Sequence, residues 1–286
     1  MELMGPDRTT EKARISLDSG RMQIFFSTQR QLSILALGAS LVVTGCGGLR
    51  TAKAPLESTL EKSSCAPNAD TLLVMLPGAY SHPDEFTREG FVKALSDNRL
   101  AVDVMRVDAH LGYYNGKTIL DRLEQDVMVP ARGKGYKSIW IIGISVGGFG
   151  GLLYAQTHPG ELAGLVALAP YLGERTLSTD IANAGGVTRW TGPLGDPPGS
   201  DPRAPNETQL WQWLRGYVGT TTTFGARPPL YLGYGTEDRF AFSHQLLAAA
   251  LPKERVFTTE GGHDWPEWTR LWRRMLPTLP LPGCPG

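Results

Sequence analysis

Residues 139–151 constrain the fold of this chain more strongly than any other stretch. An apolar run of strand length leads to Ser145, which stands between Gly143 and Gly147, and a helix-forming segment follows. A serine at such a strand-to-helix corner occupies a tight, strained turn, where side chains at the two glycine positions would clash. The alternative is a glycine-rich turn with an incidental serine, since the chain contains 34 glycines. The strand and helix patterns on either side favour the corner, which would lift the serine hydroxyl above the edge of a sheet.

This segment resembles the nucleophile elbow of the α/β-hydrolase superfamily, in which the serine is the catalytic nucleophile. The resemblance implies an α/β fold with a mostly parallel sheet flanked by helices and a small cap insertion. In that family the catalytic acid and then the histidine follow the serine along the chain. The resemblance also makes the backbone N–H of Val146 one donor of an oxyanion hole.

Two later loops supply the remaining members of a triad. A strand predicted at 229–234 precedes Glu237 and Asp238. The resemblance assigns the acid to Asp238 and leaves Glu237 as the alternative. A final strand at 254–258 precedes His263, which follows two glycines. Because a parallel sheet brings the carboxyl ends of its strands to one edge, we expect the serine, acid and histidine to meet there.

The second oxyanion donor is expected in the loop after a strand at 71–76. This loop usually carries His-Gly in the family, and here Pro77 stands in place of the histidine. The matching donor is the backbone N–H of Ala79, with that of Tyr80 as the alternative. His110 follows another strand and is a tempting base, but it precedes the serine, whereas the fold places its histidine last.

Strand and helix patterns alternate along most of the chain, as a parallel sheet with crossover helices requires. Strands are expected at 71–76, 102–107, 139–144, 162–169, 229–234 and 254–258, and helices at 83–95, 117–129, 242–251 and 265–275.

Residues 171–228 interrupt this alternation and are expected to form the small cap. The stretch is rich in Gly, Pro, Thr and Trp, and Asn206 opens a capping box for one helix. The tryptophans Trp190, Trp211 and Trp213 either shape an apolar pocket for an acyl or alcohol group or pack the cap onto the body.

A short apolar run precedes Cys46 near the start of the chain. Residues 32–43 are too few to span about 30 Å of hydrocarbon as a helix. A basic residue, this run and the small residues before Cys46 resemble the lipobox of a bacterial lipoprotein signal peptide. The resemblance implies cleavage before Cys46, lipidation of its sulfur and attachment to a membrane. The alternatives are an ordinary signal peptide, or a buried helix that ends at a chance Gly-Cys.

The lipobox implies a location in the bacterial cell envelope. Gly47 follows the cysteine, and by the same resemblance the absence of aspartate there favours the outer membrane in a Gram-negative cell. The signal peptide begins at either Met1 or Met22. The expected organisation is a signal peptide at 1–45, a linker at 46–69, and one hydrolase domain at 70–286 with its cap at about 171–228.

Cysteine and charge counts limit the other classes of site. An exported compartment permits a disulfide between Cys65 and Cys284, which would tie the two ends of the domain together, and two free thiols are the alternative. The sequence has no CxxC pair and no cysteine–histidine cluster at zinc spacing, so we expect neither a metal nor a cofactor. With 28 basic and 28 acidic residues, the chain shows no sign of nucleic-acid binding.

The resemblance as a whole implies a serine hydrolase that cleaves small-molecule carboxylic esters through an acyl-serine intermediate. A peptidase, an amidase or a perhydrolase would use the same triad, so these alternatives stay open. A non-catalytic envelope lipoprotein that keeps the fold for binding is a further alternative, although no triad residue is missing. The acyl and alcohol groups of the substrate do not follow from the sequence.

Overall fold

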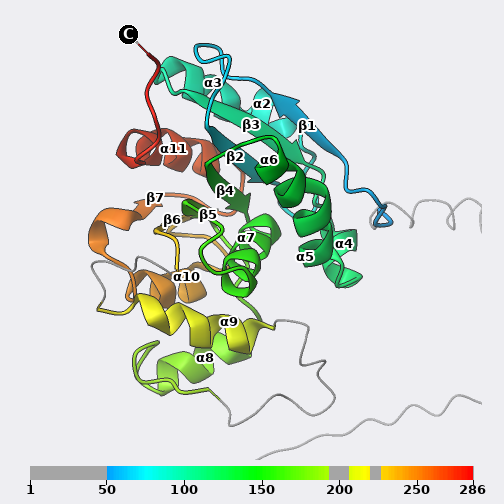
Figure 1. Cartoon of the computed structure of the whole chain (residues 1–286). Helices are drawn as coiled ribbons and strands as arrows, with labels where there is room; N and C mark the ends of the chain where they lie inside the picture. Colours follow the sequence, from blue (N-terminus) through cyan, green and yellow to red (C-terminus); the bar gives the residue numbers. More distant parts are fainter. Residues whose placement is uncertain (1–49, 193–205, 220–226, 286) are drawn as a thin grey trace, which may run out of the picture. The chain divides into compact units, whose positions relative to one another are not determined.

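A single seven-stranded sheet forms the centre of the structure (Figure 1). The computed structural model describes residues 50–192, 206–219 and 227–285. Within them the strand order is β1-β3-β2-β4-β5-β6-β7, and β1 alone runs antiparallel to its neighbour. The strands are β1 (Ser58–Glu61), β2 (Thr71–Leu76), β3 (Val102–Val107), β4 (Ser138–Ile144), β5 (Gly164–Leu168), β6 (Leu230–Gly235) and β7 (Val256–Thr259).

Helices cover both faces of this mostly parallel sheet, as the predicted α/β-hydrolase fold requires (Figure 1). One face carries α5 (Ile119–Leu123), a π-helical turn η1 (Glu124–Met128), α6 (Val129–Gly133), α7 (Val146–Thr157), α8 (Arg175–Asn183), α9 (Glu207–Leu214) and α10 (Ala241–Ala248). The other face carries α2 (Glu85–Arg88), α3 (Phe91–Asp97) and α11 (Trp265–Met275). A short helix α4 (Leu111–Asn115) follows β3.

The central strands are largely apolar because both of their faces are covered. In β2, Leu72, Val74 and Leu76 enter the core on one face, while Leu73 and Met75 enter the core on the other. All five side chains are fully buried. Such continuous apolar runs are typical of parallel strands between two helical layers.

Two predicted helices differ substantially from the observed ones, and the helix expected at 242–251 is observed as α10, which ends at Ala248. The helix expected at 83–95 is split into α2 and α3, because Gly90 between them adopts a left-handed conformation with φ 78°. The helix expected at 117–129 begins two residues later and continues through η1 into α6, so it ends at Gly133.

The predicted linker is wrong for residues 50–69, which are part of the folded domain. Leu56 is only 3% exposed and belongs to the main core. Residues 58–61 form β1, which pairs with β3 from Ser58 opposite Val107 to Glu61 opposite Val104. The sequence hides this strand because it is short and largely polar and owes its pairing to a partner about 45 residues away.

The cap insertion lies between β5 and β6 and contributes α8 and α9. Asn206 caps α9 as the capping box predicted, with its side-chain oxygen 2.9 Å from the backbone nitrogen of Gln209. Trp211 is fully buried, and its indole N–H donates to the Leu172 carbonyl at 2.8 Å. Trp190 lies in the same core, so these two tryptophans pack the cap onto the body.

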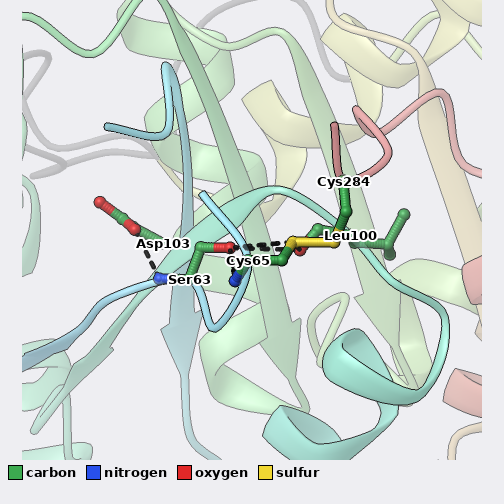
Figure 2. Close-up of a disulfide and its surroundings, with 5 residues drawn as sticks. All are labelled: Ser63, Cys65, Leu100, Asp103 and Cys284. Carbon is green, nitrogen blue, oxygen red and sulfur yellow. Dashed lines mark hydrogen bonds between the residues drawn. A yellow bond between two sulfur atoms is a disulfide. The ribbon is translucent and has the colours of Figure 1, made fainter. Parts of the chain in front are cut away.

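A disulfide joins Cys65 to Cys284 (Figure 2). Their Cα atoms lie 5.7 Å apart, although 219 residues separate them in the chain. The Cys284 amide also donates to the Arg99 carbonyl at 2.7 Å, which holds the C-terminal tail beside the start of β3. The bond therefore fastens both ends of the domain at the amino edge of the sheet.

The predicted signal peptide at 1–45 and Cys46 lie outside the described residues. In the described ranges, none of the helices combines the length and apolar character needed to cross a bilayer. The same ranges contain no group of three or more histidine, cysteine, aspartate or glutamate side chains arranged to hold a metal ion.

Candidate active site

Ser145 occupies a strained corner between β4 and α7. Its backbone angles are φ 54° and ψ −116°, a conformation that costs a non-glycine residue roughly 1–3 kcal/mol. Both flanking glycines are sterically required. A Cβ at Gly143 would overlap the Gly147 carbonyl, and a Cβ at Gly147 would overlap the Leu76 carbonyl at the end of β2. The sequence pattern therefore predicted this corner for the right physical reason.

Backbone hydrogen bonds from β5 and from the loop after it hold the corner in place. The Ser145 N–H donates to the Leu168 carbonyl at 2.9 Å, and the Ser145 carbonyl accepts from the Tyr171 N–H at 3.0 Å. The serine sits at the N-terminal end of α7, where the helix dipole presents partial positive charge.

The structure brings the three predicted triad residues together. The Ser145 Oγ lies 3.0 Å from His263 Nε2, and His263 Nδ1 lies 2.7 Å from Asp238 Oδ2. Ser145 follows β4, Asp238 follows β6 and His263 follows β7, all at the carboxyl edge of the sheet. Ser145 is 7% exposed, and the Asp238 side chain is fully buried. The buried relay of hydroxyl, imidazole and carboxyl has the geometry of a nucleophile with its base and orienting acid.

Asp238 is held in its ionised form. Burial raises the pKa of this carboxyl, but hydrogen bonds from His263 and from the Phe240 backbone N–H outweigh burial and leave the pKa below its ordinary value. The Phe240 N–H reaches Asp238 Oδ1 at 2.8 Å, so each carboxylate oxygen has a partner. A carboxylate at Nδ1 places the imidazole proton on that nitrogen and leaves Nε2 free to accept from Ser145.

The two alternatives for the acid and the base lie elsewhere. Glu237 is exposed, and its described contact is a backbone hydrogen bond to the Gly261 carbonyl at 2.9 Å. His110 caps α4, where its Nδ1 accepts the Gly112 N–H at 3.1 Å. Burial is the main cause of a lowered pKa at His110, so it is a neutral capping side chain.

The predicted oxyanion donors lie on either side of Ser145. Val146 is the first residue of α7, and Ala79 is at the centre of a turn closed by the Ser81 N–H on the Gly78 carbonyl at 3.1 Å. A Cβ placed on Gly78 would lie 3.7 Å from the Ser145 Cβ, so this turn borders the serine directly. Within the described ranges, neither the Ala79 nor the Val146 N–H donates to another residue. Both amides are available for a ligand oxygen.

Aromatic side chains that the sequence did not single out surround the histidine. The Phe240 and Trp268 rings each stand edge-on to His263 with centroids 5.2 Å away. Tyr171 contacts Phe240 at 5.9 Å and Phe149 at 5.5 Å. Phe149, Tyr171 and Phe240 are all half-buried and give the site an apolar wall. The sequence signal that could have identified them is their position, since Phe149 follows the elbow, Tyr171 follows β5 and Phe240 follows Asp238.

A second buried histidine, His244 on α10, was also missed. Its Nε2 lies 2.9 Å from the Pro170 carbonyl in the loop after β5, the loop that holds the elbow through Tyr171. Burial lowers the pKa of His244 to about 4, so the ring is neutral at pH 7. The sequence offered no signal for this contact, which joins residues 74 positions apart.

Comparisons with known proteins find similarity in three-dimensional structure alone. No protein-family model matches the sequence. No curated protein matches it significantly either. A hydrolase from Pseudomonas aeruginosa is 17% identical, with 82% of this chain and 98% of that chain covered and a TM-score of 0.49. An S-formylglutathione hydrolase from Staphylococcus aureus is 15% identical, with 75% and 82% covered and a TM-score of 0.47. Est1E from Butyrivibrio proteoclasticus, bound to ferulic acid, is 18% identical, with 78% and 94% covered and a TM-score of 0.46.

Proposed function

We propose that this protein is a serine hydrolase that cleaves carboxylic esters through an acyl-Ser145 intermediate. The observation that carries the proposal is the continuous contact from Ser145 Oγ through His263 to the ionised Asp238, at 3.0 and 2.7 Å. A serine hydroxyl alone is a poor nucleophile at neutral pH, and a neighbouring neutral imidazole with an oriented proton corrects this.

The reaction runs in two balanced halves. In the first, the Ser145 oxygen attacks the ester carbonyl carbon while His263 Nε2 takes the hydroxyl proton. The C–O bond to the alcohol breaks, and His263 returns the proton to the leaving oxygen. In the second half, a water molecule gives a proton to His263 and attacks the acyl carbon. The C–Oγ bond then breaks, His263 returns that proton to the Ser145 oxygen, and the carboxylic acid is released.

The oxyanion that forms in each half accepts hydrogen bonds from the backbone of Val146 and Ala79. Each such donor typically lowers the barrier by about 2.7–4 kcal/mol. Because both donors belong to the backbone, the proline at position 77 does not remove them. The positive end of α7 adds to the stabilisation of the same charge.

The Ser145→Ala variant tests this proposal. It should remove turnover of a p-nitrophenyl ester while the far-ultraviolet circular dichroism stays unchanged. The matched control is Ser96→Ala, because Ser96 is an exposed serine on α3 and should keep the full rate. A Ser145→Ala enzyme with undiminished turnover would rule out the acyl-serine mechanism.

The chemistry of the substrate decides between the proposal and its alternatives. A panel of p-nitrophenyl esters with increasing acyl length, beside the matching anilides, separates an esterase from an amidase or a peptidase. Dependence of the rate on hydrogen peroxide would identify a perhydrolase. A folded protein inert towards every member of the panel, and towards fluorophosphonates, would favour the non-catalytic envelope lipoprotein.

We also propose that the protein is a lipoprotein of the bacterial cell envelope, acylated on Cys46. The support is the apolar run that ends in Thr44-Gly45-Cys46. Cells fed a labelled fatty acid should incorporate the label into the wild-type protein and not into the Cys46→Ser variant. Label in both proteins, or in neither, would contradict the proposal.

A further inference from the structure

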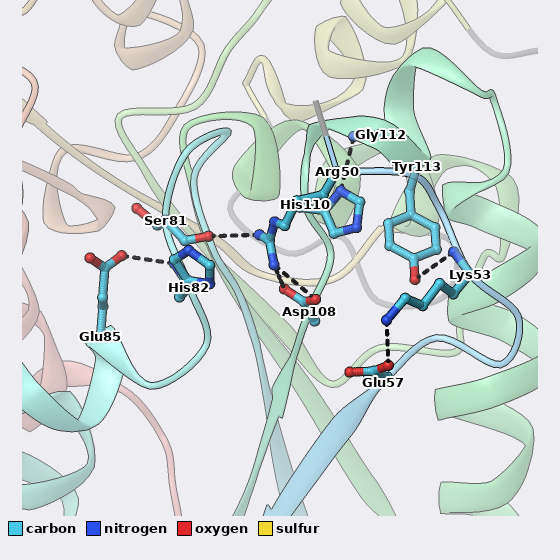
Figure 3. A network of polar contacts seen from close by, with 10 residues as sticks. All are labelled: Arg50, Lys53, Glu57, Ser81, His82, Glu85, Asp108, His110, Gly112 and Tyr113. Carbon is cyan, nitrogen blue, oxygen red and sulfur yellow. Dashed lines mark hydrogen bonds and ion pairs between the residues drawn. The ribbon is translucent and has the colours of Figure 1, made fainter. Parts of the chain in front are cut away.

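Residues 50–53 are fastened by hydrogen bonds beside the carboxyl end of β3 (Figure 3). The triad lies at the same edge of the sheet. Arg50 Nη1 lies 2.7 and 2.9 Å from the two carboxylate oxygens of Asp108, just past the end of β3. Its Nη2 donates to the Ser81 carbonyl at 3.2 Å. The Lys53 N–H donates to the Tyr113 hydroxyl at 3.2 Å. The folded domain is therefore already in place four residues after the cysteine.

This attachment leaves almost no free chain between Cys46 and the domain. Four Cα–Cα steps join Cys46 to Arg50, and at 3.8 Å each they span at most about 15 Å. A linker of 24 residues, as expected for 46–69, would have let the domain turn freely above a membrane. A linker of only a few residues instead limits which face of the domain can approach the bilayer.

The face of the domain beside Arg50, where this short linker ends, is the face that holds Ser145. Ser81, whose carbonyl accepts from Arg50, closes the turn from Gly78 through its own N–H, and a Cβ on Gly78 would lie 3.7 Å from the Ser145 Cβ. The strands β3, β2 and β4 are neighbours in the sheet. With about 4.8 Å between adjacent strands, the ends of β3 and β4 stand roughly 10 Å apart.

One side chain on this face is unusually exposed for its type. Tyr80, in the turn between Arg50 and Ser145, is 77% exposed. In the described ranges, Val129 on α6 is the one other large apolar side chain so exposed, at 50%. Tyrosine is enriched where proteins meet the headgroup region of a bilayer, because its ring is apolar and its hydroxyl is polar.

The charged side chains at residues 50 and 53 are paired, so they do not require a membrane with anionic lipids. Arg50 pairs with Asp108, and the exposed Lys53 pairs with Glu57 at 3.2 Å (Figure 3). Both of these cations are thus offset by acids. Contact with a bilayer would rest on the acyl anchor and on Tyr80, so a neutral bilayer should suffice.

We infer that the mature protein stands with the carboxyl edge of its sheet towards the membrane and hydrolyses acyl esters that reside in that membrane. The inference rests on the proposed esterase activity and on acylation of Cys46. The bilayer-resident ester transfers its acyl group to Ser145, and water releases it as a fatty acid, as in the reaction above. The short linker therefore orients the site towards the lipid bilayer and prevents the domain from turning freely.

Fluorescence quenching tests the orientation without using catalysis. The acylated full chain carries no free thiol, since Cys46 is blocked and Cys65 is bonded to Cys284. An environment-sensitive dye is attached to Tyr80→Cys or, as the control, to Val129→Cys, in phosphatidylcholine vesicles containing nitroxide-labelled lipids. The dye at position 80 should be quenched and the dye at position 129 should not. Equal quenching at both sites, or quenching at 129 alone, would overturn the inference.

A variant with a longer linker after Cys46 tests whether the short linker favours hydrolysis of membrane-embedded esters. Twenty Gly and Ser residues are inserted between Gly48 and Leu49 of the acylated protein. Turnover of a fluorogenic ester embedded in the vesicles should fall about tenfold, because effective concentration falls roughly as the −3/2 power of linker length. Turnover of a water-soluble p-nitrophenyl ester should stay unchanged. An unchanged rate on the embedded ester would contradict the inference.

The two experiments separate failure of the inference from failure of the proposed function. If the dye at position 80 is quenched while neither ester is hydrolysed, the orientation holds and the esterase proposal fails. If the soluble ester is hydrolysed while the dye at position 80 is not quenched, the esterase proposal holds and the orientation fails.

Discussion

The ionisation state of one buried carboxyl decides how the candidate site works. Asp238 accepts from both His263 and the Phe240 N–H, and these bonds keep the pKa of the carboxyl below its ordinary value despite burial. An amide in its place would keep the shape but could donate to Nδ1, which would put the imidazole proton on the wrong nitrogen.

The Asp238→Asn variant should therefore lose about 10⁴-fold in kcat on a p-nitrophenyl ester, with little change in KM. Glu237→Gln is the matched control one residue away, and it should keep the parental rate because Glu237 is exposed. Comparable losses in the two variants would argue against Asp238 as the orienting acid.

The buried His244 makes the stability of the domain depend on pH. Its pKa is lowered to about 4 in the folded protein, against about 6.5 in an unfolded chain, so the unfolded state binds more protons between these values. The contribution of the neutral His244 ring to the free energy of unfolding is fully present above about pH 6.5 and is lost as the pH falls towards 4. From pH 7 to pH 5, this group alone should lower the free energy of unfolding by about 2 kcal/mol.

Urea denaturation at both pH values measures this contribution. The His244→Gln variant removes the titrating group, so its free energy of unfolding should change less between pH 7 and pH 5 than that of the parent. Parallel losses in parent and variant would show that other groups cause the pH dependence.

The sequence predicts the triad and misses what surrounds it. Ser145, Asp238 and His263 each follow a strand with a strong pattern, so the parallel sheet determines where they meet. The contacts of His244 with the loop after β5, and of Phe240 with the histidine, join segments whose packing is set by tertiary structure alone. No local pattern reports such contacts.

At the scale of elements, the elbow depends on the close approach of α7 to the end of β2. The Gly147→Ala variant would press a methyl group onto the Leu76 carbonyl and should lower the free energy of unfolding by about 1–3 kcal/mol. It should also displace the Ala79 turn and reduce esterase turnover.

Gly133→Ala is the control for this substitution. Gly133 ends α6, and no atom lies within 4 Å of a Cβ placed there. Alanine should raise the free energy of unfolding by about 0.5–1 kcal/mol at such a site. Thermal denaturation of both variants makes the comparison, and equal destabilisation would mean that the elbow is less tightly packed than described.

The predictability of the elements follows from how each one is stabilised. Strands β2 and β4 are largely apolar on both faces, and β3 is apolar apart from Asp103 and Arg106; all three were predicted to within one residue at each end. Strand β1 was missed because Ser58-Thr59-Leu60-Glu61 becomes a strand through pairing with β3. The break at Gly90 needed knowledge of its left-handed conformation, which a lone glycine in a helical pattern does not reveal.

For the whole molecule, the two edges of the sheet are fastened by different means. Residues 50–57 hold the carboxyl edge through Arg50 and Leu56, while the disulfide between Cys65 and Cys284 holds the amino edge. The disulfide lies at the edge opposite the triad, so its loss should affect stability and leave the catalytic geometry intact.

The Cys65→Ser, Cys284→Ser double variant should lower the free energy of unfolding by about 2–5 kcal/mol, because the bond closes a long loop in the unfolded chain. Its kcat at 25 °C should match that of the parent as long as the variant is folded. A large drop in kcat at unchanged circular dichroism would show that the disulfide does shape the site.

Mass spectrometry of the fluorophosphonate-treated protein tests the catalytic assignment most directly. The structure predicts one phosphonyl adduct, on the peptide that contains Ser145, and much slower labelling in the folded His263→Ala variant. An adduct on another residue, or an unlabelled but folded wild-type protein, would contradict it.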